Sequence, residues 1–327
     1  MGTSMGAIRY DTATNEDYDV VDNQSGLLSN GIFSIKIDPQ GRPWIGTYGG
    51  GLSYRDGGRW INLNTPSGLL DAFVYDVEFY EDALWVATWS GANRIAGDPS
   101  DRSHWQGFTV ENTGGGLIDN WVYGIERDSN GRVWFGTESG VSMWDGRSWR
   151  SFNHKDGLGA PIERVRGDNV GAVSPFEGGH HAGHQADAPN LESMDYRPNY
   201  VVSFLMDAQD RLWIGTWGGG LSVLDTRDFK FRNFTARDGL PGNFILALKE
   251  GPDGELWIGS YGGLSRFDGR RFENFARING LSGGFVFSLE FGAGHSLWLG
   301  GHEGIDRLTL DPATGEPLRL DASGGPN

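Results

Sequence analysis

Cysteine is absent from the 327-residue sequence, so disulfide bonds, thiolate metal ligands and a cysteine nucleophile are all excluded. Basic residues are scarce: 27 lysines and arginines face 43 aspartates and glutamates, which leaves a net charge of −16 at pH 7. No run of lysine or arginine relieves this charge, so the sequence argues against nucleic-acid partners and against anionic membrane surfaces. No segment is long and apolar enough for membrane insertion, and the first residues lack the apolar core of a signal peptide.

Glycine and tryptophan are abundant instead, with 53 and 13 residues respectively. Disordered low-complexity chains carry few large aromatic side chains, so this combination indicates glycine turns in an ordered, β-rich fold. A chain of this length can bury a large core, and a closed all-β architecture of this size is often one domain.

One sequence unit recurs six times along the chain. Each copy has a tryptophan, a short apolar strand and a glycine turn, as in WIGTYGGGL at residue 44 and WIGTWGGGL at residue 213. An alternating strand precedes the tryptophan and two more strands follow the glycine turn, so each unit contains four strands, which we name A to D in chain order. The tryptophans that begin strand B are Trp44, Trp85, Trp134, Trp213, Trp257 and Trp298.

Four short antiparallel strands every 40–50 residues are typical of the blades of a β-propeller. Six tryptophans therefore predict an all-β, six-bladed β-propeller. The last unit has strands A to C, and residues 18–21 resemble a strand D, so we expect the N-terminal strand to join the last blade and close the ring. In this interpretation residues 1–17 are an N-terminal lead, residues 18–310 are a single propeller and residues 311–327 are a C-terminal tail.

The segments GLLSNGIFSIKIDPQGRPWIGTYGGGL (26–52) and GLPGNFILALKEGPDGELWIGSYGGL (239–264) resemble the repeat of the two-component regulator propeller family. The resemblance covers nearly the whole chain. It implies a propeller fold and a sensor-like role in signal transduction outside the cytoplasm, because such repeats usually form the sensory part of histidine kinases. No transmembrane helix or kinase sequence follows, so we expect a stand-alone propeller that is periplasmic or secreted.

The linkers from strand D to the next strand A and the B–C hairpin turns are expected to share one rim of the propeller, which we call the top rim. The linker between the third and fourth units is longer than the others by 38 residues. This insertion, residues 160–198, contains the histidine-rich sequence GGHHAGHQ and is expected to lie on the top rim.

The residue that follows the Thr, Ser or Gly of each motif is expected to point out of the B–C turn. Aromatic side chains with one wet face and a polar handle suit ligand binding, although packing on the neighbouring linker is the alternative. Trp121, which has no role in the repeat, is a further candidate. The candidates at the hairpin tips are Tyr48, Trp89, Glu138, Trp217, Tyr261 and His302.

Asparagine recurs at the start of strand A, at the expected mouth of the central channel. Six-bladed lactonases and phosphotriesterases hold calcium at such a place with asparagine and acidic side chains. The alternative is that each amide caps its linker turn. These channel-mouth residues are Asn30, Asn120, Asn199 and Asn243.

The histidines of the insertion are the candidate metal ligands. Neutral imidazole binds transition metals, so His180, His181 and His184 could hold a divalent ion such as Zn or Cu, with Ca or Mg as oxygen-ligated alternatives. Glycine-rich histidine tracts are more often loops with adventitious metal affinity.

Two functions follow from these residues. The first is an extracytoplasmic ligand- or partner-binding propeller, sensor-like or scaffolding, whose top face and insertion hold a glycan, a peptide or a protein. The alternative is a metal-dependent lyase or hydrolase at the channel mouth, similar to streptogramin-type lyases, with His302 or His184 as the catalytic base. The residues favour the binding protein over the enzyme.

Overall fold

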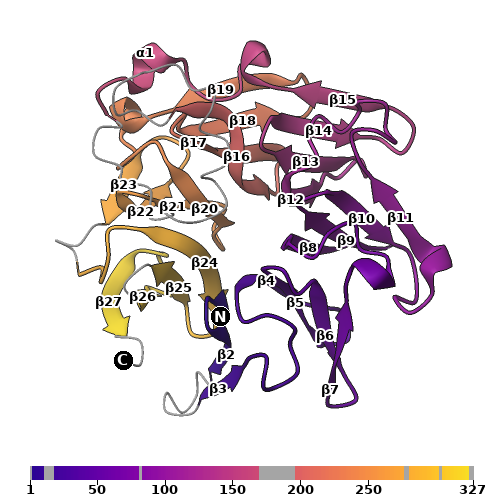
Figure 1. Cartoon of the computed structure of the whole chain (residues 1–327). Coiled ribbons are helices and arrows are strands. Elements are labelled where there is room, and N and C mark those ends of the chain that lie inside the picture. Colours follow the sequence, from indigo (N-terminus) through magenta and orange to yellow (C-terminus); the bar gives the residue numbers. More distant parts are fainter. Residues whose placement is uncertain are drawn as a thin grey trace. The chain divides into compact units, whose positions relative to one another are not determined.

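The structure is a computed structural model that describes residues 2–10, 18–80, 83–168, 196–275, 280–301 and 304–323. Within these residues the strands form seven sheets, six of four strands and one of three (Figure 1). Each sheet is a propeller blade whose strands follow one another in chain order.

The three-stranded sheet comes first, with β1 (Gly2–Thr3), β2 (Gly6–Tyr10) and β3 (Tyr18–Val21). The second sheet contains β4 (Ile32–Ile37), β5 (Pro43–Thr47), β6 (Leu52–Asp56) and β7 (Arg59–Leu63). The third contains β8 (Val74–Tyr80), β9 (Ala83–Thr88), β10 (Gly91–Ile95) and β11 (Trp105–Phe108), and the fourth contains β12 (Val122–Arg127), β13 (Val133–Thr137), β14 (Gly140–Trp144) and β15 (Trp149–Phe152).

The fifth sheet contains β16 (Arg197–Met206), β17 (Arg211–Trp217), β18 (Leu221–Asp225) and β19 (Lys230–Phe234). The sixth contains β20 (Ile245–Glu250), β21 (Leu256–Ser260), β22 (Gly263–Phe267) and β23 (Phe272–Phe275), and the seventh contains β24 (Val286–Gly292), β25 (Ser296–Gly301), β26 (Ile305–Leu310) and β27 (Pro317–Ser323). The described helices are short and lie in linkers: η1 (Thr65–Ser67), η2 (Arg102–His104), η3 (His154–Asp156), α1 (Ile162–Val165) and η5 (Ala236–Asp238).

The chain divides into two compact units, of Met1–Leu158, Asn199–Ile214 and Leu224–Lys230, and of Gly159–Pro198, Gly215–Val223 and Phe231–Asn327. In the first unit β1 lies beside β4, and the inner strands β4, β8 and β12 are successive neighbours. In the second unit the inner strands β20 and β24 are neighbours.

The prediction of six blades closed by the N-terminal strand is wrong. Strand β3, which was expected to complete the last blade, pairs with β2 in a separate first sheet. The fourth strand of the last blade is β27, from the segment that was expected to be a tail, and it pairs with β26. The physical reason is that both strands pair with the strand that precedes them in the chain. Such a hairpin needs no contact between distant parts of the sequence.

The first sheet carries the same turn chemistry as the other blades. The Thr3 hydroxyl donates a hydrogen bond to the Gly6 carbonyl at 2.7 Å, as Thr137 Oγ1 does to Gly140 at 2.8 Å. Residues 2–11, GTSMGAIRYD, thus repeat the B–C portion of the unit seen at 46–56, GTYGGGLSYRD. The given sequence begins after the position of the tryptophan in this copy, so counting tryptophans missed a blade.

The glycine of the B–C turn is required by a close backbone approach. Gly140 has a φ of 138°, and a side chain there would place its Cβ 2.3 Å from the carbonyl oxygen of Phe152. Only glycine avoids both the strained backbone and the clash, which explains why the turn of each unit repeats it.

A buried aspartate organises the A–B turn in three sheets. Asp128 Oδ1 accepts from the backbone N–H groups of Asn130 and Arg132, each at 3.0 Å, while Oδ2 accepts from Arg132 Nε at 2.5 Å and from Trp134 Nε1 at 2.9 Å. Asp38 and Asp207 make the same four contacts in their own turns. Burial alone would raise the pKa of Asp38, but hydrogen bonds from its tryptophan and arginine outweigh it and lower that pKa.

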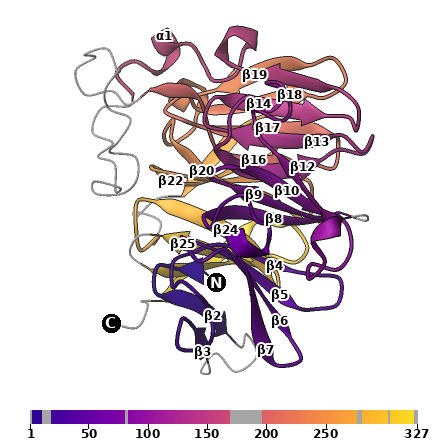
Figure 2. The same ribbon diagram turned by 45° about the vertical axis from the view of Figure 1, so that its right-hand side comes forward.

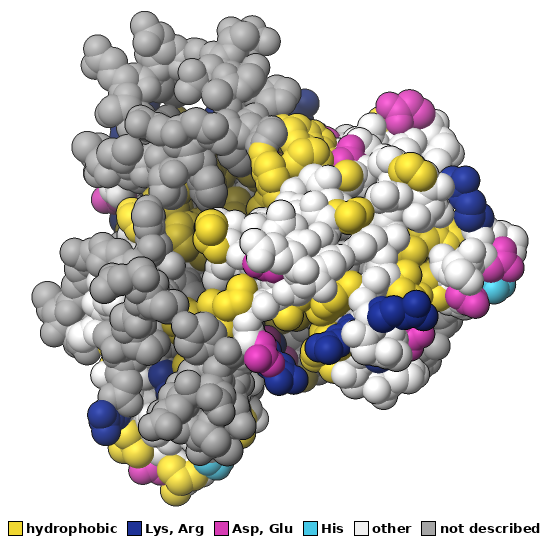
Figure 3. Space-filling model, turned by 60° about the horizontal axis from the view of Figure 1, so that its bottom comes forward, with side chains coloured by type: hydrophobic (Ala, Val, Ile, Leu, Met, Phe, Trp, Pro, Cys, Tyr) yellow, Lys and Arg dark blue, Asp and Glu magenta, His cyan; other side chains and the backbone are white. Residues whose placement is uncertain are grey.

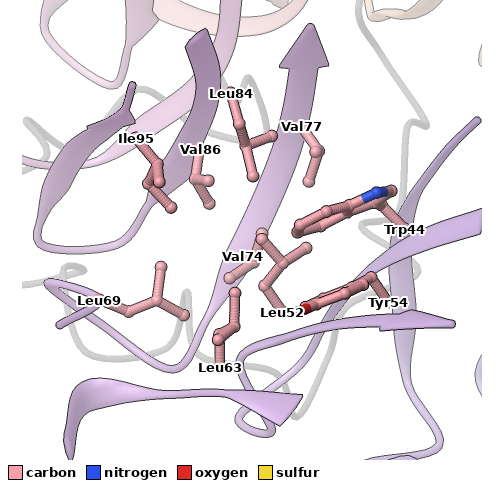
Figure 4. Close-up of a cluster of buried hydrophobic side chains, with 10 residues drawn as sticks. All are labelled: Trp44, Leu52, Tyr54, Leu63, Leu69, Val74, Val77, Leu84, Val86 and Ile95. Atoms are coloured by element: carbon pink, nitrogen blue, oxygen red, sulfur yellow. The ribbon is translucent and has the colours of Figure 1, made fainter. Parts of the chain in front are cut away.

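The core lies between sheets, where the strand-B tryptophan of one blade meets the inner strand of the next. Figure 4 shows one such cluster, with Trp44 and Tyr54 stacked at 4.2 Å beside Val74 and Val77. Val74 and Val77 are 0% exposed, which is what a tightly packed interface between two sheets requires.

Candidate binding surface on the top rim

The B–C hairpin tips and the D–A linkers are joined by backbone hydrogen bonds. The N–H of Tyr48 donates to the carbonyl of Gly31 at 2.8 Å, and the N–H of Trp89 donates to Phe73 at 3.2 Å. Side chains reinforce the same joint, since Ser90 Oγ donates to Asp71 at 2.6 Å. Each tip residue is therefore held against the start of its own strand A.

In the first unit the hairpin-tip aromatics belong to a continuous aromatic network. Phe73 lies edge-on between Tyr48 and Trp89, with ring centroids 4.8 Å apart on both sides. The ring centroid of Trp89 in turn lies 4.6 Å from that of Trp121. Tyr48 is 37% exposed, whereas Trp121 is 6% exposed and acts mainly as support for the ring beside it.

A second row of rings runs parallel to the first, along the inner strands. Phe33 stacks on Tyr75 at 4.8 Å, Tyr75 lies 4.8 Å from Tyr123, and Tyr123 lies 5.0 Å from Tyr200. Phe33 is 46% exposed. Burial raises the pKa of the Tyr75 and Tyr123 hydroxyls, and the neighbouring Tyr200 raises both further. The two rows together form one group of contacting rings in the first unit, of which Phe33 and Tyr48 are exposed, and exposed rings can contact flat apolar ligand faces.

In the second unit three rings form a compact triangle. Trp217 lies 5.3 Å from Phe244 and 5.6 Å from Tyr261, and Phe244 stacks on Tyr261 at 5.1 Å. Trp217 is 8% exposed and Phe244 is 3% exposed, so this group is mainly packing.

Sequence reasoning selected the tips and missed their partners on strand A. The missed rings occupy two equivalent positions in several units, one directly after the linker and one two residues later. An aromatic residue at one or both of these positions in each of the six units was the signal that could have found them: Phe33, Phe73, Tyr75, Tyr123, Tyr200, Phe244, Phe285 and Phe287.

Glu138 is the non-aromatic member of the tip set. Its N–H donates to the carbonyl of Trp121 at 3.2 Å, and its side chain is half-buried at the tip. The remaining candidates, His180, His181, His184 and His302, lie outside the described residues.

The four channel-mouth asparagines share one geometry. Each amide oxygen accepts a hydrogen bond from a backbone N–H of the preceding linker: Asn30 from Asn23 and Asn120 from Val110 at 2.8 Å, Asn199 from His154 at 2.6 Å, and Asn243 from Ala236 at 2.8 Å. An amide oxygen engaged in this way holds the linker at the start of strand A.

Replacing Asn243 by alanine is expected to lower the free energy of unfolding by about 1–2 kcal/mol, because the side chain is 0% exposed and its removal leaves the Ala236 N–H without its acceptor. Urea unfolding followed by tryptophan fluorescence measures the change. Asn30→Ala, which removes the same contact at an exposed site, is the matched control and should cost less. Equal costs at the two sites would contradict the role of burial.

Charged side chains gather further along the inner strands of the first unit. Lys36 Nζ lies 2.5 Å from Glu78, and Asp76 Oδ2 accepts from the backbone N–H of Ile125 at 3.1 Å. Glu126 on β12 is half-buried. Burial, followed by the charges of Glu78 and Asp76, raises its pKa well above the ordinary value.

A metal centre finds no support in the described part of the chain, where no group of three or more histidine, aspartate or glutamate side chains is placed to hold an ion. None of the helices described in the structure is long and apolar enough to span a membrane.

The sheets, the repeated B–C turns and the linker joints define a β-propeller. The family model for the two component regulator propeller matches residues 116–139, 195–218 and 239–262, so the chain carries repeats of this family and the resemblance noted in the sequence is confirmed. No curated protein sequence matches the chain.

Solved structures share the fold. The extracellular domain of BT3049 from B. thetaiotaomicron, assigned to the hybrid two component systems, superposes with a TM-score of 0.65 at 21% identity over 94% of this chain. PorZ, a surface component of the type-IX secretion system of Porphyromonas gingivalis, gives a TM-score of 0.58 at 12% identity over 98% of this chain. The chain spans 37% of the length of each of these two. YCF48, solved bound to a D1 peptide, gives 0.56 at 13% identity over 90% of this chain and 84% of its own.

Proposed function

We propose that the chain is a sensor-like or partner-binding propeller that works outside the cytoplasm and captures a ligand on its aromatic top rim. The observation that carries this proposal is the double row of rings in the first unit, with Phe33 and Tyr48 exposed at its edge. Contiguous exposed apolar patches on proteins often mark binding sites.

A peptide or protein segment is the ligand class that the comparisons support best, because YCF48 has been solved with a bound peptide. The extracellular placement of the BT3049 domain supports a role in a periplasmic or secreted setting. A glycan is compatible with the same surface, since sugar rings stack on exposed tyrosine and tryptophan.

The rim is tested by replacing Tyr48 and Trp89 together by serine and presenting the protein to arrays of oligosaccharides and twelve-residue peptides. Any ligand that the unmodified protein retains should lose about tenfold or more in affinity, because such aromatic anchors carry most of the energy of an interface. Ile61→Ser is the matched control, since Ile61 is 36% exposed on the outer strand β7, close to the 37% of Tyr48. Equal retention by the rim variant and the control would contradict the proposal.

A further inference from the structure

The two rows of rings in the first unit meet at both ends. Phe33 of the inner row lies edge-on to Tyr48 of the tip row, with ring centroids 5.6 Å apart. At the other end the ring of Tyr123 lies 6.4 Å from that of Trp121. The rings therefore form a closed circuit of contacts, in chain of contact Tyr48, Phe73, Trp89, Trp121, Tyr123, Tyr75 and Phe33.

The circuit of rings draws on three neighbouring blades. Phe33, Tyr75 and Tyr123 come from the inner strands β4, β8 and β12, which lie side by side (Figures 1 and 2). Trp89 lies at the turn between β9 and β10, and Trp121 directly precedes β12. Aromatic ring faces carry negative electrostatic potential, so a set of contacting rings attracts cations where its members reach the surface.

A carboxylate stands beside this circuit, at a position where four other repeats have a ring. Glu138 lies at the tip between β13 and β14, and its N–H donates to the carbonyl of Trp121 at 3.2 Å. This contact places Glu138 next to the end of the circuit where the two rows join. The equivalent residues of the other repeats are Tyr48, Trp89, Trp217 and Tyr261.

The turn that carries Glu138 does not require a carboxylate at this position. In the third sheet the Ser90 hydroxyl donates to Asp71 at 2.6 Å. In the fourth sheet the Ser139 hydroxyl donates to Asp119 in the same way. The same joint between tip and linker thus forms whether the residue before the serine is tryptophan or glutamate. A loop residue that the local structure does not require is a candidate for a role in binding.

The charge of Glu138 reaches the inner row of rings. Burial and the neighbouring Tyr200 raise the pKa of the Tyr75 and Tyr123 hydroxyls. Glu138 raises the pKa of both hydroxyls further, and Asp71 contributes at Tyr75. The two acids act in the same direction, so they favour a positive charge beside these rings and disfavour a negative one.

We propose that the circuit of rings, with Glu138 at its edge, binds a lysine side chain of a peptide ligand. This inference rests on the proposed function and names the group that the rim recognises. The methylene groups of the lysine lie against the rings, and its ammonium group pairs with the Glu138 carboxylate. Charge complementarity selects this group, because the chain as a whole carries a net charge of −16.

Other ligand groups fit this chemistry less well. A carboxylate or phosphate would meet the negative charge of Glu138. A sugar would need hydrogen-bonding side chains beside the rings, but Asp71 and Asp119 already accept from backbone N–H groups and serine hydroxyls that hold the linkers. Exposed hydrophobic side chains also lie between charged groups elsewhere, as Figure 3 shows on one face, so exposure alone does not select the site. The carboxylate beside the closed set of rings does.

The probes are synthetic peptides of the form acetyl-Leu-Gly-X-Gly-Leu-amide, in which X is lysine, acetylated lysine or norleucine. Isothermal titration calorimetry with the full chain measures their affinities. We expect saturable binding of the lysine peptide with a Kd of about 1 mM or lower. The two neutral peptides should bind about tenfold more weakly, because they lack the charge that interacts with the rings and with the carboxylate.

Glu138→Gln, in a variant whose circular dichroism is unchanged, should weaken binding of the lysine peptide about tenfold and leave the norleucine peptide within about twofold. Glu111→Gln is the matched control, since Glu111 is an exposed acid on the linker that leads to β12. It removes the same charge from the same rim and should change the affinity for the lysine peptide less than about twofold.

Equal affinities for the charged and neutral peptides would overturn the inference, and so would absence of binding by the lysine peptide. Equal losses in Glu138→Gln and Glu111→Gln would overturn it as well, because they would show a diffuse attraction by the acidic chain and no specific contact. In each case array ligands that the Tyr48 and Trp89 rim variant loses would still support the proposed function, so the two failures are distinguishable.

Discussion

Replacing Asp128 by alanine is expected to lower the free energy of unfolding by about 3–5 kcal/mol, the range seen when one partner of a buried ion pair is removed. Asp128 is 5% exposed and accepts from two backbone N–H groups, from the Arg132 guanidinium and from the Trp134 indole. Alanine leaves all of these donors without their acceptor. It also removes the carboxylate partner of Arg132, whose guanidinium lies over the rings of Trp134 and Phe229 at 5.6 and 5.5 Å.

Urea unfolding monitored by tryptophan fluorescence measures this loss, because Trp134 itself reports on the site. Asp145→Ala is the matched control: Asp145 also accepts three hydrogen bonds within a tight turn of the same sheet, but it is exposed. Its loss should cost about 1 kcal/mol or less. Equal stability of the two variants would contradict the conclusion that the buried carboxylate of Asp128 stabilises the A–B turn.

Replacing Glu126 by glutamine is expected to stabilise the protein increasingly as the pH rises. Burial and the nearby charges of Glu78 and Asp76 raise the pKa of Glu126 in the folded state well above the ordinary 4.5, while Lys36 opposes the shift. The folded state therefore binds a proton more tightly than the unfolded chain, and stability falls as the pH rises through the folded pKa. Glutamine keeps the shape and an acceptor oxygen but has no charge to desolvate.

Thermal unfolding measured from pH 4 to pH 9 tests this expectation. Below the ordinary glutamate pKa the variant and the unmodified protein should melt together, and at higher pH the variant should melt a few degrees higher. Glu290→Gln is the control for the amide substitution itself, because Glu290 is exposed and paired with Lys249 at 2.8 Å. A pH-independent difference for Glu126→Gln would mean that packing, rather than charge, governs the site.

The contacts within one repeat were predictable from the sequence because the residues that make them lie close together in the chain. The hydrogen bond from Thr137 to the Gly140 carbonyl lies within the B–C hairpin, and the close approach of Gly140 to the Phe152 carbonyl lies within the C–D hairpin. The sequence of one repeat is therefore enough to predict such contacts. The same holds for the Asp-x-x-Gly turn, because Asp128 accepts from the indole of Trp134 within the same A–B hairpin.

The aromatic rim was predictable only in part. Tyr48 and Trp89 were found because their place in the hairpin points them out of a turn. Their partners Phe73 and Tyr75 lie on a different strand, and only the side-by-side position of strand A and the B–C tip brings the rings together. The asparagines illustrate the same limit. A calcium site at the channel mouth and a cap on the linker turn both use the asparagine amide oxygen, and only the folded structure shows which group that oxygen contacts.

The sequence by itself determined the all-β class, the strand order within each unit and the residues of each turn, because these depend on contacts between residues close in the chain. Tertiary structure decided the number of blades and the partner of each edge strand: β3 with β2, and β27 with β26. Edge strands carry free backbone groups that several neighbours could satisfy, so the residue types of β3 and β27 left their partners open, and the folded chain pairs each with the strand that precedes it.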